Sequence, residues 1–149
     1  MMRLPIQTEG IIFRLRDNQP EFLILKRNES LGGFWQPVTG GFEEGDKSLI
    51  QSCKREIEEE TSIRPIDFIK EYPLVRMYQY LSKEKSGDLW VTEYVFGFEV
   101  KTSTVIIIGE EHDEFRWCFF EEAIRLLNYE ENKNALITLR GIIDQNYRL

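Results

Sequence analysis

GFEEGDKSLIQSCKREIEEETSI, residues Gly41–Ile63, carries the strongest structural signal of this chain. Ser48 followed three residues later by Gln51 matches a capping box, in which Ser48 accepts from a backbone amide and Gln51 reaches back. Helix-favouring residues follow, and Pro65 prevents the helix from continuing beyond them. The stretch therefore predicts a glycine-rich loop that leads into a helix over Ser48–Thr61.

The apolar residues of this predicted helix gather on one side. At about 100° of rotation per residue, Leu49, Ile50, Cys53 and Ile57 form a compact stripe that we expect to face the core. The acidic residues are then unequally placed: Glu58 points to solvent, Glu59 lies nearer the stripe, and Glu56 and Glu60 lie at its edge or within it.

Most acidic runs are solvated helix faces, and that is the simplest interpretation of residues 56–60. Two details weigh against it. Glu56 and Glu60 are four residues apart, where like charges destabilise a helix. They also lie beside the buried stripe, where an unpaired carboxylate is costly. Carboxylates in such a place need a cation, and oxygen ligands of this kind favour Mg²⁺ or Mn²⁺.

The glycine pair Gly40-Gly41 precedes the helix. Glycines let backbone groups approach a ligand without obstruction from side chains, although turns also use glycine widely. A glycine loop that enters a capped helix with three inward-leaning carboxylates is more specific than either feature alone.

The rest of the chain predicts strands before and after this helix, followed by two more helices. The expected hairpin Glu9–Arg16 and Glu21–Arg27 turns at residues 17–20. Two long strands, Ile66–Tyr80 and Trp90–Val100, are joined by the charged turn Ser82–Asp88. A short strand and two helices complete the pattern, which fits an α/β sandwich with a mixed sheet: Phe115–Phe120, Glu121–Asn128 and Asn132–Gln145.

Length and composition fit one globular domain over residues 1–149. The net charge of −7 argues against long nucleic acid as a partner, because phosphate backbones demand clustered Lys and Arg. No apolar run approaches the ~20 residues of a membrane span, and no secretory signal is evident. Cys53 and Cys118 form no metal-binding pattern, so we expect a cytoplasmic protein with free thiols, either a monomer or a homodimer.

Gly41–Ile63 resembles the signature of the Nudix hydrolases, G-x5-E-x7-R-E-U-x-E-E-x-G-U, where U is bulky and apolar. Seven of its nine specified positions agree. Lys47 replaces the first glutamate and Ser62 replaces the second glycine. Serine can also end a helix. Lys47 removes a carboxylate from the edge of the expected metal site, so we expect a change in metal number or affinity, and an inactive, ligand-binding relative stays open as an alternative.

Two further segments narrow the resemblance. FWQPVTGG from Phe34 and EHDEFRW from Glu111 are similar to segments of bacterial dihydroneopterin triphosphate pyrophosphatases. The family resemblance implies an α/β/α sandwich with a mixed central sheet. It also implies a magnesium-dependent pyrophosphohydrolase whose substrate is a small phosphorylated metabolite.

The resemblance also implies roles for residues of the motif. Glu56, Glu59 and Glu60 would be metal ligands, together with the main-chain carbonyl of Gly40. Arg55 would orient Glu56 or Glu59 through a charge-assisted hydrogen bond. Metal of this kind stabilises the charge that develops when water attacks phosphorus.

The base that activates this water varies within the family. Glu56 and Glu111 are both candidates here. His112 is more often a structural hydrogen-bonding residue than a base, and Glu93 is expected to be an ordinary outward-facing charge on a strand.

Four residues are candidates for contact with substrate. Lys26 or Arg27, at the end of a strand, would hold phosphate, although basic residues at strand ends are commonly only solvated. Phe34 and Trp35 would stack on a base or pterin ring, or would instead seal the core below the loop.

The sequence therefore predicts Mg²⁺-dependent hydrolysis of a pyrophosphate bond in a nucleoside triphosphate-like metabolite, dihydroneopterin triphosphate or a (d)NTP. The alternatives are a dinucleoside polyphosphate hydrolase and a non-catalytic, Nudix-like nucleotide-binding protein.

Overall fold

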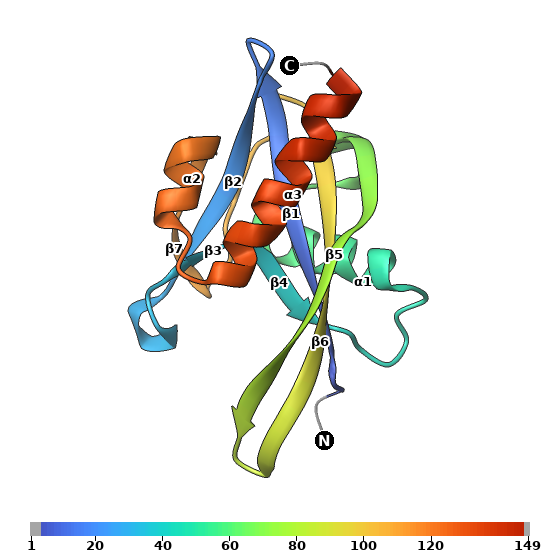
Figure 1. Ribbon diagram of the computed structural model, residues 1–149, viewed down its shortest axis with the longest axis vertical. Coiled ribbons are helices and arrows are strands. Elements are labelled where there is room, and N and C mark those ends of the chain that lie inside the picture. The colour runs from blue at the N-terminus through green and yellow to red at the C-terminus, as the bar shows by residue number, and fades with distance from the viewer. Residues whose placement is uncertain (1–3, 148–149) are drawn as a thin grey trace.

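The structure is a computed structural model that describes residues 4–147. Strands come first, interrupted by one helix, and two helices follow the last strand (Figure 1). Two short 3-10 helices, Glu29–Leu31 and Pro65–Asp67, lie between these elements. The elements are β1 (Ile6–Arg16), β2 (Gln19–Arg27), β3 (Trp35–Gln36), β4 (Val38–Gly41), α1 (Leu49–Thr61), β5 (Phe68–Glu84), β6 (Gly87–Val100), β7 (His112–Phe119), α2 (Phe120–Leu126) and α3 (Glu130–Tyr147).

The seven strands form one mixed sheet in the order β3-β2-β1-β6-β5, with β4 paired to β1 and β7 to β2. The pair β1–β6 is parallel and the other pairs are antiparallel. Strand β1 changes neighbours along its length: residues 7–10 pair with β4, and residues 13–16 pair with β2. Short β4 thus runs beside the first half of β1 and leads directly into the loop before α1.

The first hairpin is confirmed, with a tighter turn than expected. Asp17 and Asn18 alone form the turn, with φ of 52° and 65°, as a two-residue type I′ connection requires. The second hairpin is also tighter, because β5 extends to Glu84 and β6 begins at Gly87. The predicted turn Ser82–Asp88 is therefore wrong in extent. Cross-strand pairs continue to the tip and include the ion pair Lys83–Asp88.

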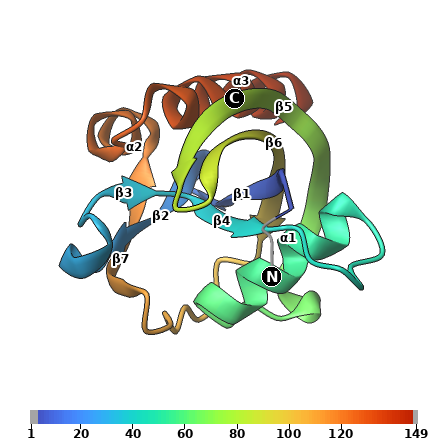
Figure 2. The same ribbon diagram turned by 90° about the horizontal axis from the view of Figure 1, so that it is seen from below.

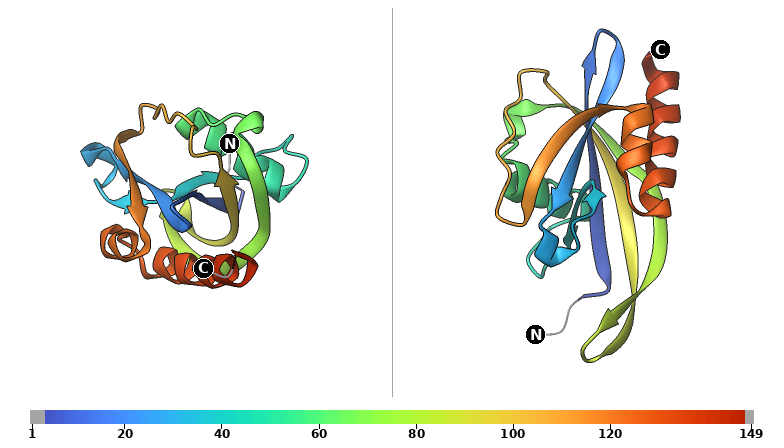
Figure 3. Two further views of the ribbon diagram at one scale, coloured as in Figure 1. Left: turned by 90° about the horizontal axis from the view of Figure 1, so that it is seen from above. Right: turned by 90° about the vertical axis from the view of Figure 1, so that its left-hand side faces the viewer.

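Helices cover both faces of the sheet, as the views in Figures 2 and 3 show. Helix α1 packs on one face, where Cys53 and Ile57 join a core cluster with Ile12 of β1. Helices α2 and α3 pack on the other, where Leu139 joins a cluster with Ile11. Neighbours Ile11 and Ile12 enter opposite clusters because successive side chains of a strand face opposite ways. The predicted α/β/α sandwich is confirmed.

None of the helices in residues 4–147 is long and apolar enough to cross a membrane.

Candidate active site

Both ends of α1 are fixed by specific backbone contacts. The Ser48 hydroxyl accepts from the backbone N–H of Gln51 at 3.2 Å, as predicted. The Gln51 side chain accepts from the N–H of Lys47 at 3.1 Å, one residue earlier than a standard capping box. At the other end Ser62 has a φ of 64°, the left-handed conformation that usually requires glycine. Its hydroxyl donates to the carbonyl of Ile107 at 3.1 Å.

The burial of α1 follows the predicted stripe. Cys53 and Ile57 are buried, and Leu49 and Ile50 pack against the same cluster. Glu58 is exposed and Glu60 is buried, with 8% of its surface accessible. The helix therefore presents some carboxylates to water and draws others into the protein.

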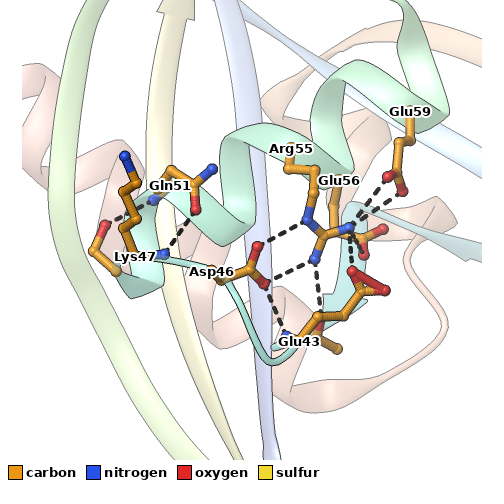
Figure 4. A network of polar contacts seen from close by, with 9 residues as sticks. Glu43, Asp46, Lys47, Gln51, Arg55, Glu56 and Glu59 are labelled. Atoms are coloured by element: carbon orange, nitrogen blue, oxygen red, sulfur yellow. Dashed lines mark hydrogen bonds and ion pairs between the residues drawn. The ribbon is translucent and has the colours of Figure 1, made fainter.

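Arg55 is the centre of an ion-pair network formed by residues of α1 and of the loop before it (Figure 4). Its guanidinium donates to Glu56 Oε1 at 2.9 Å and to Glu59 Oε1 at 3.2 Å. It also donates to the carbonyl of Gly41 at 3.3 Å and lies 3.3 Å from Glu43 Oε2. The Arg55 side chain thus contacts both carboxylates that we expected it to orient, and joins them to the loop.

Asp46 is the main partner of Arg55, and sequence reasoning missed it. Its two carboxylate oxygens accept from Arg55 Nε and Nη2, each at 3.0 Å. Only 6% of the Asp46 side chain is exposed, and the Arg55 hydrogen bonds lower the pKa of Asp46 to about 2. Asp46 precedes Arg55 by nine residues and lies in the loop before α1, so no helical period relates the two. Only the proximity of Asp46 to Lys47 in the motif was available as a signal. Figure 4 shows the Lys47 side chain turned away from Arg55.

The Glu56 side chain packs directly against the backbone of Gly40. A Cβ added at Gly40 would overlap the Glu56 side chain and approach its Oε2 to 2.5 Å. Burial raises the pKa of Glu56, against the opposing effect of Arg55. The end of β4 therefore accommodates the Glu56 carboxyl group only because residue 40 has no side chain.

Glu60, His112 and Arg27 meet deeper in the same region. Burial raises the pKa of Glu60 to about 8, with further contributions from Glu56 and Glu111 and an opposing one from Arg27. Glu60 Oε2 is buried without a hydrogen-bond partner among the described residues. His112 Nε2 lies 3.7 Å from Glu60 Oε1, and the His112 side chain is fully buried. Arg27 faces His112 across β2 and β7; burial lowers the pKa of His112, and the charge of Arg27 lowers it further.

The segment between β6 and β7 brings Glu111 toward this group. Its backbone is held against the end of α1, where Ile107 donates to the carbonyl of Thr61 at 3.0 Å and Gly109 to that of Glu60 at 3.2 Å. Glu111 is exposed, and its charge contributes to the raised pKa of Glu60.

The donor set suits a divalent cation. The carboxylates of Glu56 and Glu60 are the hard oxygen ligands that Mg²⁺ and Mn²⁺ prefer. The raised pKa values and the unpartnered Oε2 of Glu60 are what a nearby cation would relieve. Glu59, the third expected ligand, is 58% exposed and lies 3.2 Å from Arg55. Within the described residues, no three acidic, histidine or cysteine side chains are already gathered closely enough to hold a metal ion.

The four candidate substrate residues differ in their surroundings. Lys26 forms an ion pair with Glu29 at 3.4 Å, and the Nε of Arg27 is buried without a hydrogen-bond partner in the described chain. The Phe34 ring is half-buried below the Arg27 guanidinium, at 5.9 Å. The Trp35 ring packs against the core cluster of the α3 face, as expected of a residue that seals the core.

The expectation that Glu93 is outward-facing is wrong. It is 2% exposed, and its Oε1 accepts from Gln7 Nε2 at 3.1 Å and from the Tyr78 hydroxyl at 3.2 Å. A single strand does not reveal which of its faces is covered, so the sequence offered no signal for this burial.

A family model described as the NUDIX domain matches residues 7–139. The asymmetrical bis(5'-nucleosyl)-tetraphosphatase of Rattus norvegicus is 30% identical over 118 residues, which cover 78% of this chain and 76% of that protein. An octanoyltransferase of Myxococcus xanthus is 31% identical over 130 residues, covering 85% of this chain. The chain spans only 34% of the length of that relative.

Solved structures give the same result. A Listeria monocytogenes protein described as a NUDIX hydrolase has a TM-score of 0.81 and 30% identity, with 97% of each chain covered. The dihydroneopterin triphosphate pyrophosphohydrolase of E. coli has a TM-score of 0.75 and 24% identity, covering 90% of this chain and 93% of that one, and this likeness concerns the fold. The chain therefore belongs to the Nudix hydrolase family, and its domain is that of a Nudix pyrophosphohydrolase.

Proposed function

We propose that this protein hydrolyses a pyrophosphate bond in a nucleoside triphosphate-like metabolite, with Mg²⁺ as its cofactor and Mn²⁺ as an acceptable substitute. The contact of Glu56 with Gly40, beside a buried Glu60 whose Oε2 has no partner in the described residues, carries the proposal. A cation that offsets their charge would stabilise such carboxylates together. Glu56, Glu59, Glu60 and the Gly40 carbonyl would hold the metal.

The bound metal would neutralise charge on the phosphate oxygens and the leaving group. The protein's own residues orient the reactants. Arg55 holds Glu56 in place through its 2.9 Å hydrogen bond, while Asp46 fixes the guanidinium from the opposite side. Arg27, with a buried Nε that lacks a partner within residues 4–147, would donate to a substrate phosphate.

Two carboxylates are candidates for the group that accepts a proton from the attacking water. Glu56 is half-buried and oriented by Arg55, which favours it on geometry. Glu111 lies on the segment held against the end of α1 and is exposed. The two roles separate experimentally, because Glu111→Gln would reduce turnover without weakening metal binding, whereas Glu56→Gln would impair both.

Dihydroneopterin triphosphate and (d)NTPs are the substrates that we favour, and dinucleoside polyphosphates are the alternative. The similarity to the rat tetraphosphatase supports the alternative, while the FWQPVTGG and EHDEFRW segments support the first. A non-catalytic nucleotide-binding protein is the remaining possibility, because Lys47 stands where the motif has glutamate. The Lys47 side chain points away from Arg55, and Asp46 is the partner of Arg55. This arrangement supports an intact site.

A substrate panel tests the proposal. The purified protein would be incubated with Mg²⁺ and (d)NTPs, dihydroneopterin triphosphate and diadenosine tetraphosphate, and released phosphate and pyrophosphate measured. We expect turnover of at least one triphosphate. Glu59→Gln and Glu60→Gln should lose most turnover while folding normally, and Glu58→Gln, on the exposed side of the same helix, should retain it. Binding of a panel member without turnover of any would show a sensor rather than an enzyme.

A further inference from the structure

Two of the longer strands in residues 4–147, β5 and β7, pair with a neighbour on one side only. A free edge presents unpaired backbone N–H and C=O groups to any other strand, so proteins usually obstruct it. The edge of β5 is obstructed. Pro73 has no N–H to donate, and Leu74 has a φ of 43°. The pairing of β5 with β6 also shifts register between Tyr72 and Arg76, which bends the edge.

The edge of β7 is open in its central part. The pairing of β7 with β2 is regular from Glu114 to Phe119, and the one register shift lies next to His112 at the start of the strand. The strand contains neither proline nor glycine, and residues 113–116 are all exposed. The backbone there has a free edge to which a further strand can pair.

The side chains of β7 alternate between two faces. Phe115, Trp117 and Phe119 lie on the α1 side of the sheet, since Trp117 packs against the core cluster on that side. Phe115 is 36% exposed and Phe119 47%, although such rings usually contribute to cores and interfaces. Glu114 and Arg116 lie on the other side and form an ion pair at 3.2 Å, yet 46% and 45% of their side chains stay exposed. The open edge thus offers exposed rings on one face and two opposite charges on the other.

We propose that β7 is a dimer interface, in which it pairs antiparallel with β7 of a second copy and Phe115 lies opposite Phe115. Homodimers usually have a two-fold axis, and an axis perpendicular to the sheet pairs identical edge strands in this way. Glu114 of each copy then lies directly opposite Arg116 of the other. The interface therefore contains two identical pairs of opposite charge on one face and a pair of phenylalanine rings on the other.

The two charges distinguish this register from its neighbours. Paired side chains lie on the same face, so the two-fold axis must pass through a residue. An axis through Glu114 or through Arg116 would put like charges directly opposite each other, which destabilises a strand pair. An axis through Trp117 would leave Arg116 opposite Cys118, with no opposite charge. The axis through Phe115 pairs Glu114 with Arg116 twice, so the edge is complementary to a copy of itself.

The dimer does not depend on the proposed function. Glu114, Phe115 and Arg116 hold neither the metal nor the substrate in that proposal, so failure of one leaves the other standing. The regular segment of β7 is short, and we therefore expect a small interface with a dissociation constant in the micromolar range. The affinity should also fall with added salt, because exposed charge pairs are screened.

Sedimentation equilibrium of the wild-type protein tests the dimer directly. We expect the average mass to rise from that of one chain toward that of two between about 1 μM and about 200 μM protein. Hydrogen exchange over the same range locates the interface, because backbone amides within residues 113–117 should exchange more slowly as the dimer forms. A monomer at every concentration overturns the proposal, and so does a dimer in which those amides exchange no more slowly.

Charge reversal assigns the interface to its residues. Glu114→Arg and Arg116→Glu should each raise the dissociation constant at least about tenfold, because each turns both attractive pairs into repulsive ones. Mixing the two variants should restore wild-type affinity, since a dimer with one copy of each again has two attractive pairs. Arg125→Glu, an equal change of charge at an exposed position of α2, is the matched control and should dimerise as wild type does.

The mixture separates a role in the interface from a loss of folding. A variant that only folds less well would not regain affinity when it is mixed with the other. Weakening by both variants without recovery in the mixture overturns the assignment, as does an equal weakening by Arg125→Glu. The measurements on the wild-type chain decide the matter even if a variant fails to fold.

Discussion

The contact between Gly40 and Glu56 shows how a single missing side chain can shape an active site. Glu56 occupies the space that any Cβ at position 40 would take. The adjacent glycine differs, because a Cβ at Gly41 would have no heavy atom within 4 Å apart from its chain neighbours. Two consecutive glycines of one motif thus have different structural requirements.

This difference predicts opposite results for two alanine variants. Gly40→Ala should displace the Glu56 carboxyl group and lower kcat by roughly 10²-fold, as misplacement of about 1 Å at a reacting centre does. Gly41→Ala should fold and turn over within a few-fold of wild type, because its added methyl group meets open space. Steady-state kinetics with circular dichroism on both variants checks this, and equal losses in the two would contradict it.

The Asp46–Arg55 pair predicts a dependence of stability on pH. The pKa of Asp46 is about 2 in the folded protein, below its ordinary value of 3.8, so the folded state binds this proton less readily than the unfolded state. The contribution of Asp46 to stability is therefore present above pH ~4 and is lost as the pH falls through about 2. Denaturant unfolding of Asp46→Asn should show a weaker decline over that interval. Lys47→Ala, beside it on the loop, is the control and should decline as wild type does.

At the scale of elements, α1 is held from both ends. Its N-terminus is capped by Ser48 and its C-terminal carbonyls accept from the segment before β7, through Ile107 and Gly109. The same contacts place Glu60 and Glu111 in one region. Stability of the helix and assembly of the site are consequently linked.

The cap predicts a measurable loss of stability. Ser48→Ala removes the 3.2 Å bond to Gln51 N–H and should lower the free energy of unfolding by about 1 kcal/mol. Ser86→Ala, at the exposed tip of the β5–β6 hairpin, provides a control with an unchanged free energy. Urea denaturation of the two variants decides the matter. A loss in the control as large as in Ser48→Ala would show that the cap is not responsible.

At the scale of the whole molecule, β1 lies between the two core clusters and contributes side chains to both. Its two faces contribute to separate core clusters, under α1 and under α3. Its first half carries Glu9 on one face and pairs with Gly40 through Thr8. The buried Glu9 and the proposed metal site therefore lie on opposite faces of the same pair of strands, β1 and β4.

The repulsion among buried carboxylates predicts that a divalent cation stabilises the fold. Mg²⁺ at 100 times its Kd should add about 2.7 kcal/mol of apparent stability and raise Tm, because it binds the folded state alone. EDTA should reverse the increase, and Glu56→Gln should abolish it. Glu58→Gln should retain it. Differential scanning calorimetry gives the readout, and an unchanged Tm of wild type at millimolar Mg²⁺ would refute the metal site.

Local patterns in the sequence determined the element types, the limits of α1 and the side on which its carboxylates lie. These features depend on helical periodicity and capping, which act within a few residues. Motif spacing likewise indicated the family, and it was enough to predict that Glu56, Glu60 and Gly40 share one site. The short turns of both hairpins were misjudged because strand ends depend on cross-strand pairing.

Only the tertiary structure determined which polar residues are buried and what they contact. Asp46 meets Arg55 across a loop, Glu9 is buried against Asn132 of α3, and Glu93 is buried against Tyr78 of β5. Glu9 and Asn132 are 123 residues apart, and Asp46 and Arg55, although only nine apart, are related by no helical or strand period, so no local pattern encodes these contacts. The motif from Gly41 to Ile63 indicated the chemistry through spacing along one helix, while the packing of a distant helix brought Asn132 to the buried Glu9.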